Sequence, residues 1–422
     1  MKSLKQKIIC CINKWKTGGD FMYTKEDVLA YVNEENVTFI RLAYFDIYGH
    51  QKNISILPDE LPRAFAEGIS FDASAIAGFG TDIKSDLFLM PDPSTLSILP
   101  WRSLDGSVIR MYCDIQYPDG TPFELDTRYL LKRAEQYAKE QGVEIQIGTE
   151  FEFYLFLTDE KGQNSYIPLD TAGYMDIAPE DQGEDVRKDI CFTLQEMGLH
   201  PEASHHEEGP GQNEIDFRYS TPLQAADDAA TFKWVVRTVA KANGLIADFD
   251  PKPLKEHSGN GMHVNVSVND SGHLDQTRAF MAGILYRLPE ITLFLNPCTE
   301  SYQRLGECKA PKFVTWSYQN RSQAIRIPAV RNQKKRIELR SPDCTSNPYL
   351  VYLLIIYAGI EGILEQREPA DPVDLNLYQA STEITSHLTP LPSSLEESSA
   401  IAKNSDFIQR VLPKEILKNY LK

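Results

Sequence analysis

The chain has 422 residues, more than one ordinary hydrophobic core accommodates, so we expect two domains. With 42 % hydrophobic and 24 % charged residues, its composition is typical of a globular protein. The net charge of −17 argues against a nucleic-acid-binding surface, which would need a basic face.

The first 21 residues differ in character from the rest of the chain, and we treat 1–21 as an N-terminal extension without expected structure. Their apolar run, Ile8–Ile12, is too short for a signal peptide or a membrane span. Met22 is a candidate alternative start. The seven cysteines include no CxxC pair and are expected to be reduced thiols. These features predict a cytoplasmic protein that does not contact a membrane.

Predicted helices and strands begin at residue 24. The segment TKEDVLAYVNEENV (24–37) predicts a capped amphipathic helix that begins at Thr24. The next two segments, VTFIRLAYFDIYG and QKNISIL, alternate apolar and polar residues as strands do. Residues 81–100 are rich in Asp, Pro and Ser and predict a loop.

A domain boundary is expected near residue 117. The turn at 118–120 is followed by DTRYLLKRAEQYAKEQG (126–142), which predicts a helix capped by Asp126. We therefore expect a small α+β domain over 22–117 and a larger domain over 118–422, in which helices alternate with short strands.

Five segments of the larger domain carry polar residues on one strand face and apolar residues on the other, because residues two apart point to the same side of a strand. For any one of them, a half-exposed sheet with a solvated face is the simpler explanation. The polar positions are Glu150 and Glu152 in GTEFEFYLF; Glu214, Asp216 and Arg218 in NEIDFRY; His263, Asn265 and Ser267 in MHVNVSV; Arg326 in AIRIP; and Arg336, Glu338 and Arg340 in RIELRS.

Together the five segments favour a site. One sheet would gather Glu150, Glu152, Glu214, Glu338 and His263, and four neighbouring carboxylates cannot all stay ionised without cations. Oxygen ligands with one imidazole suit Mg²⁺ or Mn²⁺. The arginines on the same faces would bind phosphate or carboxylate, and these groups together are typical of phosphoryl transfer. No P-loop or dinucleotide-binding motif is present in the sequence.

These segments, in this order, resemble the glutamine synthetase superfamily, the bacterial type I enzymes in their shorter form. The resemblance runs from about residue 24 nearly to the C-terminus. It rests on six motifs: FDASAI (71–76), GTEFEF (148–153), SHHEEGPGQNEIDF (204–217), SGNGMH (258–263), NRSQAIRIP (320–328) and RIELRSPDCTSNPYL (336–350).

The resemblance implies an N-terminal β-grasp domain and a C-terminal catalytic domain with a curved antiparallel sheet flanked by helices. It also implies a homo-oligomeric ring, commonly a dodecamer, with active sites between subunits. The implied metal ligands, for two or three Mg²⁺ or Mn²⁺ ions, are Glu150, Glu152, Glu207, Glu214, His263 and Glu338. The implied glutamate contacts are Gly259, Arg304, Arg321 and Arg340, and the implied ATP contacts are Glu202, Ser267, Arg321, Arg326 and Arg336.

The implied reaction has two steps. The γ-carboxylate of glutamate attacks the γ-phosphate of ATP, which gives γ-glutamyl phosphate and ADP, and ammonia or another amine then attacks the acyl phosphate. Arg321 and Arg326 would stabilise charge on the transferred phosphoryl group. Asp72, from a neighbouring subunit, matches the residue that helps to deprotonate ammonium.

The sequence departs from the family pattern at the flap SYQRLGECKAPKF (301–313). Members of the family carry a glutamate two residues before a proline here, and this chain has Lys309. Glu307 is a candidate substitute, whereas Lys309 and Lys312 would repel a cationic amine and suit one that carries its own carboxylate. Ser258 and Asn265 are further departures in the substrate and metal regions.

Two features bear on assembly and regulation. The sequence stops at KNYLK, where relatives continue with a further helical segment that often helps to hold subunits together, so the sequence does not specify the ring size. NLYQ resembles the adenylylation loop of regulated members at Tyr378, although an unmodified surface tyrosine is the simpler interpretation.

Three functions therefore remain open from the sequence: a glutamine synthetase that uses ammonia, a γ-glutamyl ligase with another nitrogen donor, and a weakly active regulatory ring protein. The intact metal and arginine positions count against the third, and Lys309 is the feature that separates the first two.

Overall fold

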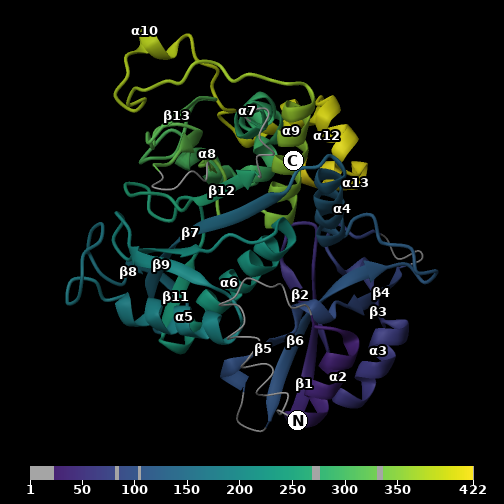
Figure 1. Cartoon of the computed structure of the whole chain (residues 1–422). Coiled ribbons are helices and arrows are strands. Elements are labelled where there is room, and N and C mark those ends of the chain that lie inside the picture. The colour runs from purple at the N-terminus through teal and green to yellow at the C-terminus, as the bar shows by residue number, and fades with distance from the viewer. Residues whose placement is uncertain (1–22, 81–84, 103–105, 269–275, 330–335, 422) are drawn as a thin grey trace. The chain divides into compact units, whose positions relative to one another are not determined.

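The computed structural model describes residues 23–80, 85–102, 106–268, 276–329 and 336–421. The predicted extension, residues 1–21, lies outside this part of the chain. The chain divides into two compact units (Figure 1). The smaller comprises the residues up to 129 together with 192–199, and the larger comprises 130–191 and 200–422.

The smaller unit is built on a six-stranded sheet with the strand order β2-β1-β6-β4-β3, to which β5 adds by pairing with β6. Strands β1 and β6 run parallel and the other pairs are antiparallel. The elements are α2 (Lys25–Glu34), β1 (Val37–Phe45), β2 (Gln51–Ile56), α3 (Leu61–Glu67), β3 (Ile69–Asp72), β4 (Asp86–Pro91), β5 (Ser97–Ile98) and β6 (Ser107–Gln116).

The predicted first helix is confirmed as α2. Thr24 accepts a hydrogen bond from the backbone of Asp27, whose carboxylate bonds back to Thr24, so the first turn closes as a capping box. Helices α2 and α3 pack on the sheet, whose inner side chains, among them Leu42 and Ile109, are fully buried.

The prediction of a loop over residues 81–100 was wrong in part. Strand β4 crosses this stretch and pairs with both β3 and β6, and β5 follows it. Leu87 and Leu89 alternate with more exposed neighbours and are buried, which is a strand pattern. Pro91 at the end of β4 and Pro93 just after it hid this signal, because proline usually marks a turn.

The larger unit is built on a nine-stranded sheet with the strand order β13-β14-β15-β12-β7-β10-β9, and β8 and β11 also pair with β7. All pairs are antiparallel except β13 with β14. The strands are β7 (Ile145–Thr158), β8 (Asn164–Pro168), β9 (Pro201–His206), β10 (Gln212–Phe217), β11 (Leu245–Asp248), β12 (Met262–Val268), β13 (Trp316–Tyr318), β14 (Ile325–Ile327) and β15 (Ile337–Leu339).

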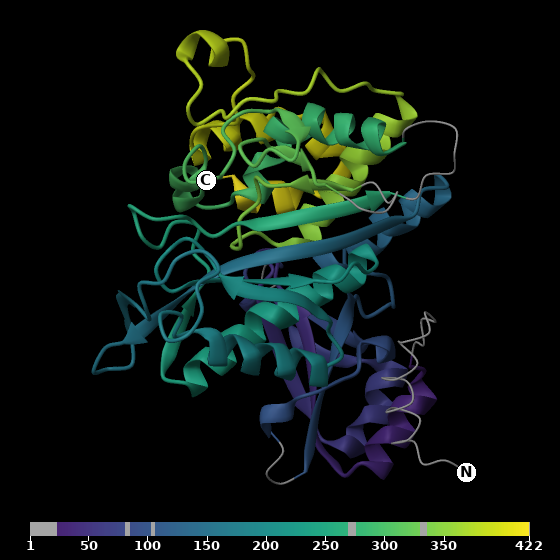
Figure 2. The same cartoon turned by 60° about the vertical axis from the view of Figure 1, so that its left-hand side comes forward.

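Strand β7 is the longest strand of this sheet and runs through its middle (Figure 2). The helices are α4 (Thr127–Glu140), which begins in the smaller unit, α5 (Glu184–Glu196), which ends in the smaller unit, α6 (Pro222–Ala242), α7 (Gln276–Leu295), α8 (Thr299–Arg304), α9 (Pro348–Leu364), α10 (Thr382–Thr385), α11 (Leu395–Lys403), α12 (Asp406–Val411) and α13 (Lys414–Tyr420). Helix α4 confirms the prediction over 126–142, and the Asp126 carboxylate accepts a bond from the Arg128 amide at its start.

One face of the sheet forms the core. Phe151 and Phe153 of β7 are fully buried and pack around Phe232 of α6. Burying an aromatic side chain of this size stabilises the fold by about 2 kcal/mol. Helices α7 and α9 pack closely behind, and at Gly283 a Cβ would lie 2.1 Å from the Ala358 carbonyl oxygen. Since the apolar side chains fill this face, the polar side chains of the same strands point to the other.

Among the described residues, no helix is both long and apolar enough to span a membrane.

A candidate active site on the polar face of the larger sheet

A cavity of about 250 Å³ opens on the polar face of the sheet in the larger unit. It brings together side chains that are far apart in the sequence. Its lining includes Glu150, Glu152, Glu207, Glu208, Glu214, Asp216, Ser258, Gly259, His263, Arg304, Lys309, Arg321, Arg326 and Arg340.

Strand register accounts for the acidic side of the cavity. Glu214 of β10 stands directly opposite Glu152 of β7, and Asp216 stands opposite Glu150. On the other edge of β7, His263 of β12 is the partner of Glu150. Like charges directly opposite in a sheet repel. This arrangement is therefore unfavourable unless protons or cations neutralise it.

The pKa values of three of these carboxyl groups reflect the same repulsion. Burial, together with the charge of Glu207, raises the pKa of Glu152 to about 7. Burial and the neighbouring carboxylates, Glu152 first among them, raise the pKa of Glu214 well above its usual range. Burial and Glu150 likewise raise the pKa of Asp216 to about 7. Burial and Arg340 hold the pKa of His263 well below its usual value, so this imidazole is neutral.

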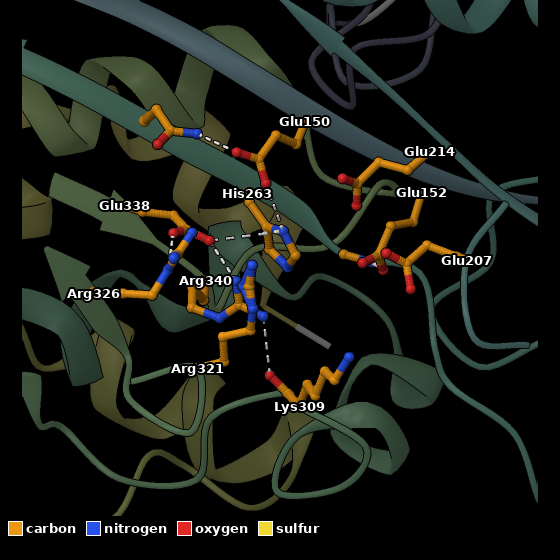
Figure 3. A network of polar contacts seen from close by, with 12 residues as sticks. Glu150, Glu152, Glu207, Glu214, His263, Lys309, Arg321, Arg326, Glu338 and Arg340 are labelled. Atoms are coloured by element: carbon orange, nitrogen blue, oxygen red, sulfur yellow. Dashed lines mark hydrogen bonds and ion pairs between the residues drawn. The ribbon is translucent and has the colours of Figure 1, made fainter. Parts of the chain in front are cut away.

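Three sets of three ligand atoms, with the atoms of each set within 4.8 Å of one another, could each hold a metal ion, and all their members except His205 are predicted ligands. They are Glu150 with His263 and Glu338, Glu152 with Glu214 and His263, and His205 with Glu207 and Glu214. Figure 3 shows the five acidic side chains and His263 turned toward a common space. A fourth set, Glu150 with Glu214 and Asp216, includes a residue that the strand pattern singled out without assigning it a role.

The neighbours of these carboxylates fix their direction. Asn265 donates to Glu150 with a nitrogen-to-oxygen distance of 2.7 Å, so this departure from the family pattern orients a predicted metal ligand. The Gly261 amide donates to Glu152 at 2.6 Å. Glu207, in the irregular segment after β9, is bonded by His205 at 3.2 Å and by the Glu208 amide at 2.9 Å.

The basic side of the cavity centres on Glu338, which is fully buried. The guanidinium groups of Arg326 and Arg340 both pair with its carboxylate (Figure 3). Arg304 is also buried, and it donates to the Ser341 carbonyl at 2.9 Å. These contacts hold the guanidinium planes in place, which suits recognition of a carboxylate or phosphate.

Gly259 lies close to Arg304, where a side chain would not fit. A Cβ at this position would lie 2.2 Å from the Pro251 carbonyl oxygen and 2.9 Å from Cγ of Arg304. The neighbouring Ser258 lines the cavity, and its carbonyl accepts a hydrogen bond from the Tyr154 hydroxyl at 2.6 Å. The backbone of this segment therefore approaches the arginines directly.

Five predicted site residues do not line the cavity, and one of them, Glu338, is fully buried. Glu202 is exposed on β9, Ser267 lies near the end of β12, and Arg336 directly precedes β15. Asp72 belongs to the smaller unit, at the end of β3, where hydrogen bonds from Ser74 lower the pKa of its carboxyl. Sequence reasoning in turn missed Glu208, Tyr174 and Met175, which line the cavity from segments without a periodic pattern.

The flap contributes Lys309 to the cavity lining and not Glu307. The Glu307 carboxylate instead pairs with Lys252 at 3.3 Å. The Tyr378 hydroxyl donates to the flap carbonyl of Ala310 at 3.2 Å. The tyrosine of the NLYQ motif is therefore in contact with the flap, with 39 % of its surface exposed.

Comparison with known proteins places these features in a family. The family model "Glutamine synthetase, catalytic domain" matches residues 124–422, and "Glutamine synthetase, beta-Grasp domain" matches residues 36–118. The chain is 41 % identical over 414 residues to a glutamine synthetase of Clostridium saccharobutylicum, with 94 % of each chain covered. It is 41 % identical over 413 residues to a glutamine synthetase of Methanosarcina mazei, with 94 % of this chain and 92 % of the relative covered.

Solved structures agree on the architecture. A complex of GmaS with ADP matches with a TM-score of 0.84 and 26 % identity, and 93 % of each chain is covered. The Plasmodium falciparum glutamine synthetase matches with a TM-score of 0.82 and 23 % identity over 94 % of each chain, which supports the fold alone.

Proposed function

The chain belongs to the glutamine synthetase family, and from that premise we propose that it is an ATP-dependent ligase that joins the γ-carboxylate of glutamate to ammonia. The observation that carries the proposal is the cavity in which a carboxylate and imidazole cluster faces Arg304, Arg321, Arg326 and Arg340. Transfer of an anionic phosphoryl group between two anionic substrates needs carboxylates that can hold metal ions together with arginines that bind the anions.

The residues present fit divalent metal ions. Carboxylates in register across β7 and β10 repel one another, the pKa values of Glu152, Glu214 and Asp216 are raised, and the imidazole of His263 is neutral, as a metal ligand must be. We propose that Glu150, Glu152, Glu207, Glu214, His263 and Glu338 hold two or three Mg²⁺ or Mn²⁺ ions. Such ions, when bound, neutralise the phosphates of ATP and make the γ-phosphorus more electrophilic.

The arginines have separate roles in this proposal. Arg304 and Arg340, with the backbone of Gly259 that lines the cavity, hold the carboxylates of glutamate so that the γ-carboxylate faces the γ-phosphate. Arg321 and Arg326 neutralise the phosphoryl group as it leaves ADP and bonds to the γ-carboxylate oxygen. Glu202, Ser267 and Arg336 would contact ATP outside the cavity lining.

The second step is amide formation. Ammonia attacks the γ-carbonyl carbon of γ-glutamyl phosphate, and phosphate leaves. We propose that Asp72 of a neighbouring subunit takes a proton from ammonium. This role requires a homo-oligomer, and we expect a ring, commonly a dodecamer. We expect the protein to act in the cytoplasm. Hydrogen bonds from Ser74 lower the pKa of the Asp72 carboxyl and keep it ionised, so that its negative charge attracts ammonium. We also retain the division into domains at 22–117 and 118–422 as a proposal.

A second candidate is a γ-glutamyl ligase with a different amine as nitrogen donor. The observation that favours it is Lys309, which lines the cavity from the flap. Its charge is compensated, because its ammonium group pairs with Glu208 at 2.6 Å. The pairing removes much of the repulsion that a free lysine would exert on ammonium, so ammonia remains the preferred donor.

Transfer of labelled oxygen tests the proposed chemistry. Glutamate carrying heavy oxygen in its γ-carboxylate is incubated with ATP, Mg²⁺ and ammonium, and the phosphate released is analysed by mass spectrometry. Attack through γ-glutamyl phosphate places one labelled oxygen in each phosphate formed. Phosphate free of label would show that water, not the γ-carboxylate, attacks ATP, and the proposal would fail.

A further inference from the structure

The flap holds Lys309 in an unusual backbone conformation. Cys308 and Lys309 have φ values of 42° and 68°, a region that side-chain-bearing residues seldom adopt and that carries strain. The conformation is supported from two sides, because the Arg340 guanidinium donates to the Lys309 carbonyl at 3.4 Å and the Tyr378 hydroxyl donates to that of Ala310 at 3.2 Å. The placement of the lysine is therefore built into the site, as Figure 3 shows for its contact with Arg340.

The ammonium group of Lys309 lies in surroundings that suit a monovalent cation. Its nitrogen is 2.6 Å from a carboxylate oxygen of Glu208 and 5.2 Å from the ring centroid of Tyr174. A carboxylate beside an aromatic face attracts any small ammonium ion, whether it belongs to a side chain or to a ligand. Glu208, Lys309 and Tyr174 line the same cavity as the predicted metal ligands.

The ion pair of Lys309 with Glu208 is exposed enough for a soluble cation to replace the lysine. The side chains of Lys309 and Glu208 keep 40 % and 39 % of their surface accessible, and ion pairs at such exposure contribute little to stability. A soluble cation can therefore displace the lysine. Glu307 cannot take part in the same way, because it pairs with Lys252 and lies outside the cavity lining.

We propose that Lys309 is an internal competitor for the nitrogen donor: its ammonium group is held by Glu208 where a protonated amine must bind, and it thereby sets the affinity for ammonium and excludes larger alkylamines. This inference rests on the proposed function. It assigns to Glu208 and Lys309, within the same site, the selection of the nitrogen donor. The charge at Glu208 attracts the donor, and the charge and the stem of Lys309 act against it.

The test separates charge from volume with two substitutions. Lys309→Met keeps a long side chain without its charge, and Lys309→Ala removes both. We expect each to lower KM for ammonium by about fivefold, the ratio that corresponds to one exposed ion pair with one cation–π contact. The value of kcat should stay within about twofold, because neither variant removes a proposed metal or phosphoryl contact. Only Lys309→Ala should in addition accept methylamine and ethylamine.

Matched controls isolate the pair. Lys312→Ala removes a lysine of the same flap that lies over Phe313 and not in the cavity lining, and it should leave KM for ammonium unchanged. Glu208→Gln removes the attracting carboxylate and should raise that KM. Hydroxylamine, which is mostly uncharged at neutral pH, should show a KM that responds to none of these changes. Thermal unfolding of each variant confirms that the fold is kept.

Two results would overturn the inference for different reasons. If the wild type turns over with ammonium but both Lys309 variants keep its KM, the lysine does not compete and the inference alone fails. If ammonium does not accelerate phosphate release by the wild type, the proposed function fails and takes the inference with it.

Discussion

The stability of the metal-free protein should fall as the pH rises toward neutrality, because the site collects carboxylates that fold more readily when protonated. The pKa of Glu152 is raised from 4.5 to about 7 and that of Asp216 from 3.8 to about 7. Between the ordinary and the raised pKa, the folded state binds more protons than the unfolded state. The free energy of unfolding therefore decreases with rising pH across this window and levels off above it.

The size of the effect is set by the raised pKa values. For Glu152 alone, the change amounts to about 3 kcal/mol above neutral pH, and the contribution of Asp216 does not simply add because Glu150 and Glu214 interact with both. In a unit of this size we expect the thermal midpoint to fall by about 5 °C between about pH 5 and pH 8. Divalent metal should restore it, because the ion neutralises the same carboxylates.

Thermal unfolding with chelator, and with Mg²⁺ or Mn²⁺, measures this at each pH. Asp126, a buried carboxyl of the smaller unit whose pKa burial also raises to about 7, adds to the pH dependence but not to the metal dependence. The metal-induced shift is therefore the specific readout, and Glu214→Gln should reduce both it and the pH slope. A midpoint that metal does not move at any pH, or a Glu214→Gln variant that responds as the wild type does, would refute the reasoning.

Three further predictions concern single residues. Glu338→Gln leaves the buried guanidinium group of Arg340 and the partly buried one of Arg326 without their carboxylate, so it should destabilise the protein by about 3 kcal/mol and abolish phosphate release, as unfolding and activity assays would show; wild-type stability would contradict this. Asp72→Asn should suppress glutamine formation but retain slow glutamate-dependent ADP release, and its co-expression with Glu338→Gln should partly restore activity if sites lie between subunits; failure to complement would favour a site within one chain. Gly259→Ala places a Cβ 2.2 Å from the Pro251 carbonyl oxygen, so KM for glutamate should rise by about tenfold, and an unchanged KM would show that this backbone does not contact glutamate.

The family resemblance and the fold predicted with it, a β-grasp domain followed by a catalytic domain, are confirmed by the family models that match the chain. Alternation along single strands predicted a shared polar face for Glu150, Glu152, Glu214, His263 and Glu338, because residues two apart in a strand point to the same side. The structure adds which strands are neighbours in the sheet. This pairing could not be predicted from alternation, because it joins segments that are far apart in the sequence.

Residues in irregular segments were beyond this reasoning. Glu207 follows β9 in a segment without a period, and only the family resemblance pointed to it. Glu208 and Lys309 are far apart in the sequence and meet through the fold of the whole unit, so the sequence showed a lysine in the flap but not its partner. Glu307 was a reasonable substitute for the flap glutamate from the sequence, because the sequence does not show which residues meet in the fold. In the structure its carboxylate pairs with Lys252.

The most direct test of the proposed activity is phosphate release from ATP with glutamate and Mg²⁺ or Mn²⁺, measured with ammonium added and withheld. We predict a strong dependence on ammonium, with one glutamine formed for each phosphate released. Slow glutamate-dependent release that ammonium does not accelerate would contradict the proposed donor and direct the search to another amine.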